Sequence, residues 1–372
     1  MHNIASAKEW YIVEDAEEVD SPALLVYADR VKNNIRLIKT MLSDISMLRP
    51  HVKTNKMAEV CRMMMEEGIT KFKCATIAEA EMLGMTGAPD VLLAYQPVGP
   101  KVLRLIELIR KYPSTRFSCL SDNKDNLERI NTLAGAHDLS IGIFIDLNIG
   151  MNRTGIKPPD ATELIRYGNT LKHVQLRGLH AYDGHIHDTD LSVRKQKCDE
   201  AFSGILSLQK ELGDEGQNLI VVAGGTPTFP IHAQRGGVEC SPGTFVFSDW
   251  GYKHLLPDET FNYAALVLTR VISIVDSTTI CTDLGYKSVA AENPLPRVHF
   301  LNAPAAEPIG QSEEHLVLRV ADAAQYRIGD ILYGAPVHIC PTVALYHIAN
   351  VVINNKVEDQ WRVIARDRAI TV

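Results

Sequence analysis

Short apolar runs alternate with longer amphipathic segments from residue 21 to about residue 225. Most of the runs are rich in Val, Ile, Leu or aromatic residues, and they fall at 22–27, 49–54, 71–76, 90–95, 115–121, 139–147, 176–183 and 218–225. Apolar runs of this length are typical of parallel strands that are buried on both faces. The pattern therefore predicts eight parallel strands, each followed by a connecting segment.

The connecting segments carry the periodicity of amphipathic helices. Val31, Ile35 and Ile38 recur at spacings of three or four residues, which places them on one helical face. Eight strand–helix units in about 200 residues fit a (β/α)8 TIM-like barrel. A doubly wound open sheet is the alternative that the same alternation allows.

The pattern changes after about residue 260. The segments 265–285, 313–320, 347–353 and 360–367 alternate in polarity and are rich in Val, Ile and Thr, and helical periodicity fades. This predicts a smaller, mostly antiparallel β-domain. We expect an α/β protein with a barrel over residues 21–260 and a β-domain over 261–372, to which residues 1–20 return.

Composition narrows the classes of function. The 372 residues are 46% hydrophobic with a net charge of −7, so the chain has a core but no basic excess for nucleic acid. It has no apolar run long enough to span a membrane and no secretory signal. The seven cysteines are scattered without a CxxC pair, which indicates reduced thiols and a cytoplasmic location.

The run RPHVKT at 49–54 contains a lysine in an otherwise strand-like setting. An unpaired lysine costs several kcal/mol in a protein interior. On a strand, His51 and Lys53 lie at period two and face the same side at the carboxyl end, where barrel enzymes have their active sites. Lys53 is therefore either paired with a barrel carboxylate or a reactive amine whose pKa is lowered by burial.

A candidate phosphate site follows the run at 218–225. Gly224, Gly225 and Thr226 offer backbone amides and a hydroxyl to an anion, although a GG pair is more often a simple turn. Barrels often bind phosphate at the loops after strands seven and eight. A lysine in the barrel mouth and a phosphate cradle across the rim together predict pyridoxal phosphate, held by Lys53 as a Schiff base.

Other polar residues follow the predicted strands. Tyr182 either flanks the cofactor ring or packs in the barrel, and Arg153 binds the cofactor's phenolic oxygen, a substrate carboxylate or a surface acid. His51 stands beside Lys53, and Thr76 is a weaker phosphate candidate. His185 and His187 lie at period two in the stretch GHIH and are candidate bases.

His338 and Cys340 flank Ile339 in the stretch VHICPT near the carboxyl end. On an extended segment they face the same way, as two ligands of one ion require. Imidazole with thiolate suits zinc, and imidazole also accepts other divalent metals such as manganese. The alternative is a buried cysteine beside a hydrogen-bonded histidine.

Several blocks, taken in order, resemble the fold-type III pyridoxal-phosphate enzymes, and among them the D-threonine aldolase / D-serine dehydratase-like family. They include PALLVY, RPHVKTNK, CATIAEAE, NIGMNRTGI, YDGH, GGTPT, SPGTFVF and PVHICPTVALY, and cover most of residues 20–347. RPHxK and HxCPT are the specific ones, and alanine racemase is a more distant likeness. The resemblance implies a homodimer that binds pyridoxal phosphate and a divalent metal.

The metal favours a small β-hydroxy amino acid as substrate, because a Lewis acid can grip or expel a β-hydroxyl group, and the resemblance implies the D configuration. In our hypothesis Lys53 holds the cofactor and His185 or His187 takes the hydroxyl proton, so that a retro-aldol reaction yields glycine and an aldehyde. The alternatives are β-elimination, as in a D-serine or D-threo-3-hydroxyaspartate dehydratase, amino-acid racemisation, and a non-catalytic cofactor carrier.

Overall fold

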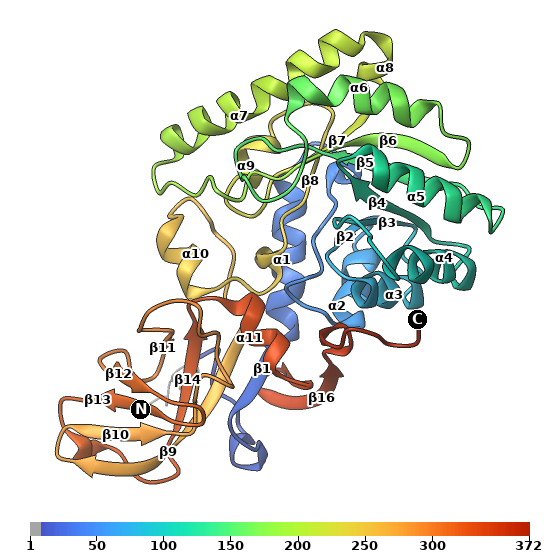
Figure 1. Ribbon diagram of the computed structural model, residues 1–372. Helices are drawn as coiled ribbons and strands as arrows, with labels where there is room; N and C mark the ends of the chain where they lie inside the picture. Colours follow the sequence, from blue (N-terminus) through green and yellow to red (C-terminus); the bar gives the residue numbers. More distant parts are fainter. Residues whose placement is uncertain (1–8) are drawn as a thin grey trace. The chain divides into compact units, whose positions relative to one another are not determined.

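The computed structural model describes residues 9–372, which form two compact units (Figure 1). The barrel unit comprises 35–245, 255–260 and 364–372. The sheet unit comprises 9–34, 246–254 and 261–363. Helix α1 (Ala28–Thr40) contributes residues to both units.

The barrel unit is built on a parallel sheet of seven strands in sequential order. The strands are β2 (Lys71–Cys74), β3 (Asp90–Leu93), β4 (Arg116–Ser121), β5 (Ile141–Asp146), β6 (Val174–Ala181), β7 (Ile220–Ala223) and β8 (Val238–Cys240). The helices that connect them are α2 (Ala58–Glu66), α3 (Ile77–Met85), α4 (Lys101–Lys111), α5 (Lys124–Gly135), α6 (Pro158–Asn169), α7 (Leu191–Leu212), α8 (Asp214–Gln217) and α9 (Phe229–His232). Figure 1 shows helices α4 to α7 on the outside of this sheet.

Residues 48–51 connect the two edges of the parallel sheet. Leu48 forms a parallel β-bridge with Cys240 in β8, and His51 forms one with Lys73 in β2. The backbone bonds agree, since Arg49 N donates to Cys240 O at 2.8 Å and Lys73 N donates to Pro50 O at 2.8 Å. This segment is the irregular eighth member of the barrel, and the closure excludes an open doubly wound sheet. The predicted fold class is confirmed.

Two of the eight predicted barrel strands need correction. The run 22–27 contains β1 (Ala23–Tyr27), which pairs with strands of the sheet unit instead. All of β1 is buried, so its composition resembles that of a parallel barrel strand. The run 49–54 is extended only as far as His51 and turns at 52–55. The strand missing from the prediction is β8, which has only three residues.

The sheet unit contains a mostly antiparallel sheet of nine strands, in which β1 and β15 form a parallel pair. The strands after β1 are β9 (Ala265–Asp276), β10 (Thr279–Thr282), β11 (Val298–Phe300), β12 (Glu307–Gln311), β13 (Leu316–Arg319), β14 (Ile331–Pro336), β15 (Ile348–Ile353) and β16 (Lys356–Arg362). Its helices are α10 (Trp250–Leu255), whose last residue belongs to the barrel unit, and α11 (Ile339–Leu345).

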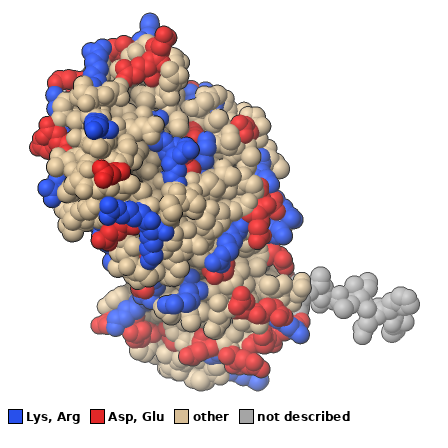
Figure 2. Space-filling view, turned by 90° about the vertical axis from the view of Figure 1, so that its right-hand side faces the viewer, with Lys and Arg blue, Asp and Glu red and all other residues tan. Residues whose placement is uncertain are grey.

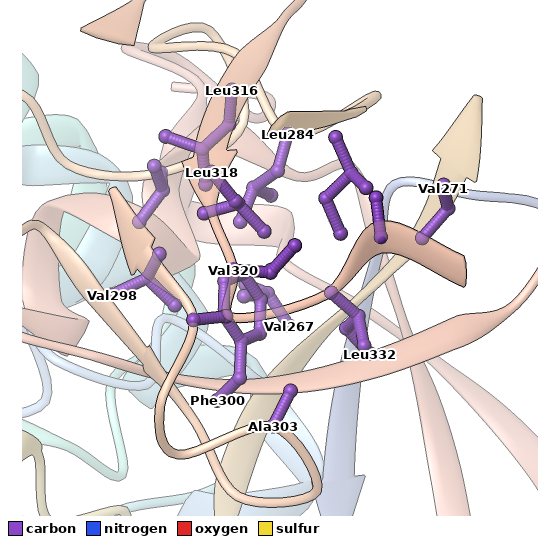
Figure 3. Close-up of a cluster of buried hydrophobic side chains, with 14 residues drawn as sticks. Val267, Val271, Leu284, Val298, Phe300, Ala303, Leu316, Leu318, Val320 and Leu332 are labelled. Atoms are coloured by element: carbon purple, nitrogen blue, oxygen red, sulfur yellow. The ribbon is translucent and has the colours of Figure 1, made fainter. Parts of the chain in front are cut away.

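The sheet unit has its own hydrophobic core. Val267, Leu316, Leu318 and Val298 are fully buried and pack with Phe300 in one cluster (Figure 3). Because alternate residues of a strand face opposite sides, Leu316 and Leu318 of β13 both point into this cluster. The rigid core fixes the strand β14 that precedes α11.

The surface carries charges of both signs. On the face shown in Figure 2, lysine and arginine side chains are interspersed with aspartate and glutamate. Among residues 9–372, none of the helices has both the length and the apolar character needed to cross a membrane.

Candidate active site

Two polar layers lie inside the barrel unit, separated by apolar side chains. Leu92, Leu120, Phe144 and Val222 form the apolar cluster between them. The amino-end layer consists of Arg49, Lys71, Asp90, Arg177 and Glu239. The carboxyl-end layer consists of Lys53, Lys73, Asp146, His180 and Tyr182, with the exposed Arg153 at its rim. Active sites of barrels lie at the carboxyl ends of the strands, so the second layer is the candidate site.

Lys53 lies in the turn that directly follows the bridge at His51, not on a strand as the period-two argument assumed. Its side chain is partly buried, and Nζ lies 5.8 Å from the centre of the Tyr182 ring. Within residues 9–372 its amine has no carboxylate partner. The neighbouring Lys56 forms an ion pair with Glu79. Of the two lysines in this turn, Lys53 is thus the one whose amine is available for chemistry.

Lys73 is a second buried amine in the same layer, and the sequence analysis did not identify it. Its side chain is only 2% exposed, and Nζ lies 3.4 Å from His180 Nε2. His180 Nδ1 lies 2.7 Å from Asp146 Oδ1. Burial and the nearby charge of Lys53 lower the pKa of Lys73 to about 7, so this amine loses its proton near neutrality.

The chain Lys73–His180–Asp146 has a defined direction. The Asp146 carboxylate accepts a hydrogen bond from His180 Nδ1, which leaves Nε2 with its lone pair toward Lys73. Burial opposes the charge of Asp146, but the hydrogen bond from His180 keeps the pKa of Asp146 below its usual value. Burial together with Lys73 lowers the pKa of His180, which favours the neutral imidazole.

Tyr182 brings three cations together. Lys53 Nζ, Lys73 Nζ and Arg153 Cζ lie 5.8, 5.5 and 5.3 Å from the centre of its ring. Distances below about 6 Å allow each cation to be attracted by the ring electrons. Lys53 and Arg153, joined by Lys73 when its amine is protonated, make this centre electropositive, which suits an anionic ligand.

The glycine segment after β7 lies against the same tyrosine. A methyl group placed on Gly225 would come within 3.2 Å of Tyr182 Cε2, and Gly224 has a φ of +79°, which favours glycine. Thr226 Oγ1 accepts hydrogen bonds from Gly243 N at 3.3 Å and Thr244 N at 3.2 Å. The loops after β7 and β8 are therefore joined at Thr226.

These two loops fit a phosphate group. The Ser241 hydroxyl is buried and has no hydrogen-bond partner within residues 9–372, so it can donate to an acceptor such as a phosphate oxygen. Glycine amides and hydroxyl groups at the loops after strands seven and eight are the usual donors to phosphate in barrels. The predicted segment follows β7, which is the seventh strand of the barrel when residues 48–51 are counted as the first, and β8 adds the second loop.

His51 and Thr76 support the site from the side of β2. Burial and the charges of Lys53 and Lys73 hold the pKa of His51 well below its usual value, so its imidazole is neutral. Thr76 is the N-cap of α3, where its Oγ1 accepts a hydrogen bond from Glu79 N at 3.1 Å. Its hydroxyl is thus engaged in the helix start, although it can still donate one bond.

His185 and His187 lie apart from the buried layer, on the surface after β6. Both are exposed, and they line one surface pocket with Asp188 and Lys197. His187 Nδ1 lies 3.0 Å from His185 O. The histidine that contacts a site amine is His180, to which the sequence analysis gave no role.

The metal pair has a different local structure from the one expected. His338 is the N-cap of α11 and Cys340 lies in its first turn, so the segment is not extended. The side chains of His338 and Cys340 are nevertheless hydrogen-bonded to each other. Burial alone would lower the pKa of His338, but the hydrogen bonds to Cys340 and Glu292 outweigh it and raise this pKa to about 9. His338 Nδ1 lies 2.5 Å from Glu292 Oε1. Glu292 lies 46 residues away in sequence, so no local motif announces it.

Asp249 completes the charged groups around α11. Its carboxylate accepts hydrogen bonds from Ile339 N at 3.1 Å and Tyr252 N at 2.8 Å. Burial raises the pKa of Asp249 to about 6. Imidazole, thiolate and carboxylate groups at the start of one helix are a suitable donor set for a divalent metal.

A separate group of ligand-type side chains is buried behind the glycine loop. Asp183, Cys198 and His232 have their polar atoms within 4.8 Å of one another. Both Asp183 oxygens already accept hydrogen bonds, from Thr228 Oγ1 at 2.8 Å and from His232 Nε2 at 2.7 Å. Burial raises the pKa of Cys198 to about 12, which keeps its thiol protonated. We interpret this group as a hydrogen-bond network that fixes the loop.

The families that match this chain agree with its fold and with the sequence motifs that suggested the family resemblance. The family described as "Alanine racemase, N-terminal domain" matches residues 26–249, and the "Putative serine dehydratase domain" matches residues 264–352. The chain belongs to the alanine racemase N-terminal domain family, whose members have the fold-type III barrel. Within it, the resemblance to D-threonine aldolase and D-serine dehydratase-like proteins is confirmed.

Relatives cover nearly the whole chain. A D-threonine aldolase of Arthrobacter sp. is 26% identical over 94% of this chain and 93% of its own length. A 3-hydroxy-D-aspartate aldolase of Paracoccus denitrificans is 26% identical over 95% of this chain and 94% of its own. Aldolases and dehydratases both occur among the relatives, so these relatives are lyases.

Solved structures give the same fold. A D-threonine aldolase from Filomicrobium marinum superposes with a TM-score of 0.86 at 24% identity, over 94% of this chain and 96% of that one. A D-threo-3-hydroxyaspartate dehydratase, solved as a cysteine-to-alanine variant in the metal-free form, gives 0.81 at 22% identity, over 93% and 98%.

Proposed function

We propose that the protein is a pyridoxal-phosphate- and divalent-metal-dependent lyase that cleaves a β-hydroxy D-amino acid into glycine and an aldehyde. The observation that carries the proposal is the position of Tyr182. Its ring lies within 5.8 Å of the Lys53 amine, and it also packs against the glycine loop after β7. A cofactor with an aldehyde at one end and a phosphate at the other requires this combination.

Each part of the cofactor has a matching group in the barrel unit. Lys53 would bind the aldehyde carbon, and the loops of Gly224, Gly225 and Thr226 would bind the phosphate. The Arg153 guanidinium would bind the phenolic oxygen or the substrate carboxylate, and the Tyr182 ring would pack against the cofactor. When bound, pyridoxal phosphate supplies the electron sink that weakens bonds at the substrate's Cα.

His338 and Cys340 would hold a divalent ion, zinc or manganese, with Glu292 orienting His338 through its Nδ1 atom. Such an ion supplies a Lewis acid for the β-oxygen of the substrate. We retain His185 and His187 as proposed bases for the β-hydroxyl proton. Lys53, once released from the cofactor, can hold a proton at Nζ. By family resemblance we also propose a homodimer.

The test is a product assay on purified protein supplied with cofactor and zinc or manganese. Glycine and acetaldehyde from D-threonine support the aldolase. Pyruvate and ammonia from D-serine, or oxaloacetate and ammonia from D-threo-3-hydroxyaspartate, support the dehydratase alternative. EDTA should remove most of either activity, since both reactions use the ion as the Lewis acid for the β-oxygen. Racemisation that survives EDTA would overturn the lyase proposal.

A variant pair separates the two candidate bases. If His185 is the base, His185→Gln should lose activity while His187→Gln keeps it, and the reverse holds if His187 is the base. Binding of the cofactor should be unchanged in both, because neither histidine contacts the Tyr182 cluster. Full activity in both variants would remove the GHIH stretch from the mechanism.

A further inference from the structure

Lys73 has no role in any of the steps above, yet it is the most unusual charged group of the barrel unit. It is buried, and within residues 9–372 its amine forms no ion pair with a carboxylate. Among the residues that the structure describes, its hydrogen-bond partner is His180 Nε2. An ammonium group that is buried without a carboxylate partner destabilises the folded state, so Lys73 is a candidate for a role in function.

Lys53 places a second amine beside the same Tyr182 ring. Both amines lie within 6 Å of the Tyr182 ring centre, and the two charges interact. Two like charges beside one ring disfavour each other, and burial together with the charge of Lys53 lowers the pKa of Lys73 to about 7. One of the two amines is then neutral near physiological pH.

An amine must be neutral before it can bind an aldehyde, because the ammonium nitrogen has no lone pair. We propose that Lys73 is a second amine of the active site, which accepts the proton that Lys53 must lose before Lys53 can bind the cofactor. This inference rests on the proposed role of Lys53. Lys73 acts through Lys53 and is therefore a positioning residue.

The step balances. The proton on Lys53 Nζ moves to the neutral Lys73 Nζ, which leaves a lone pair on Lys53. The Lys53 nitrogen then attacks the aldehyde carbon and water is released as the carbon–nitrogen double bond forms. The new ammonium at Lys73 donates a hydrogen bond to His180 Nε2, and Asp146 fixes the imidazole in the tautomer that accepts it.

The surroundings of Lys73 contain groups of both signs. Lys53 and Arg49 oppose its charge, whereas Asp146 and Asp183 favour it. His51, His180 and Tyr182 face it with rings, and Arg153 lies across the Tyr182 ring. The carboxylates are engaged with His180 and with His232 and Thr228, so they temper the charge without pairing with it.

The test measures the two amines directly. Apo-protein is labelled with a trace of acetic anhydride between pH 6 and 11, and the acetylation of Lys53 and Lys73 is quantified by mass spectrometry. We expect the summed reactivity of the pair to rise in two steps, the first near neutral pH. Both amines unreactive below about pH 9, like an ordinary lysine, would overturn the inference without reference to any cofactor.

The second test compares Lys73→Met with Lys71→Met, two residues earlier on the same strand. At pH 7.5 we expect Lys73→Met to bind pyridoxal phosphate about tenfold more slowly than wild type, and the difference to shrink as the pH rises toward 11, where hydroxide can take the Lys53 proton in place of Lys73. Lys71→Met should bind it at the wild-type rate throughout. A Lys73→Met protein with the wild-type pH profile would contradict the inference.

The controls keep the two proposals apart. If Lys53→Ala still develops the visible absorbance of bound cofactor, the proposed role of Lys53 is wrong. If Lys53→Ala loses it and Lys73→Met keeps the wild-type profile, only the inference about Lys73 fails. Lys73→Gln, which retains a polar group toward His180 but accepts no proton, should behave as Lys73→Met does.

Discussion

The two polar layers of the barrel unit contain similar residues and differ in how the charges are paired. In the amino-end layer Arg49 forms ion pairs with Glu239 at 2.7 Å and with Asp90 at 2.6 Å. Arg177 and Lys71 bind the remaining oxygens of the same carboxylates. In the carboxyl-end layer Lys53, Lys73 and Arg153 converge on Tyr182 without a carboxylate partner among residues 9–372.

Lys71 and Lys73 show the contrast within one strand. They lie two residues apart on β2 and therefore face the same side. Lys71 is ion-paired with Glu239, whereas Lys73 lies against the His180 imidazole and the Tyr182 ring. The ion pairs of the amino-end layer specify how the strands assemble. The unpaired amines of the carboxyl-end layer can bind an anion and transfer protons.

The largest expected effect is on the unpaired layer. Lys53→Ala removes the amine proposed to bind the cofactor, so lyase activity should fall by at least about 10³-fold, as expected for loss of a covalent catalytic group. Activity and visible absorbance after addition of pyridoxal phosphate measure this. Retained absorbance at the bound-cofactor wavelength would mean that another lysine carries it.

The next effect is on the paired layer. Arg49→Met leaves the buried Glu239 with Lys71 alone and Asp90 with Arg177 and the more distant Arg116, which should cost about 3 kcal/mol of unfolding free energy. Urea denaturation of the apo-protein measures the loss. Cofactor binding by the folded fraction should be unchanged. A variant that is as stable as wild type would show that the layer does not support the barrel.

Features that depend on residues close together in sequence could be predicted from the sequence. The parallel strands, Lys53 and the glycine segment 224–226 were all accessible from short motifs, and the fold class followed from the alternation of elements. Strand β1 was misplaced because a fully buried strand has the same composition in either sheet. Strand β8 was missed because three residues are too few to show a period.

Lys73 was missed for a different reason. Lys71 and Lys73 alternate with the buried Phe72, which in sequence is the pattern of a half-exposed strand. Closure of the sheet through residues 48–51 turns that face of β2 inward, and this closure cannot be predicted from the local sequence of β2. The partner of His338 is equally distant, since Glu292 precedes it by 46 residues.

Substitution of Lys73 is expected to change the free energy of unfolding by a smaller amount than Arg49→Met and in the opposite direction. The pKa of Lys73 is about 7 in the folded chain and near 10.5 when unfolded, so the unfolded chain binds more protons between these values. Stability should therefore rise as pH increases from 7 to 10, and the burial cost is complete below pH 7. Lys73→Met should stabilise the apo-protein by about 1–3 kcal/mol at pH 6 and by less at pH 10. Urea denaturation at both pH values measures this, and equal stability of the two proteins at pH 6 would contradict it.

The smallest effect is expected at Lys71, the matched position in the paired layer. Its side chain is 25% exposed, and Glu239 keeps Arg49 as a second partner, so Lys71→Met should lower the unfolding free energy by about 1 kcal/mol. The loss should shrink in high salt, because a partly exposed pair is screened. Denaturation in low and high salt measures both. If Lys71→Met and Lys73→Met change stability in the same direction at pH 6, the distinction between a paired and an unpaired layer fails, because the two lysines would then be energetically equivalent.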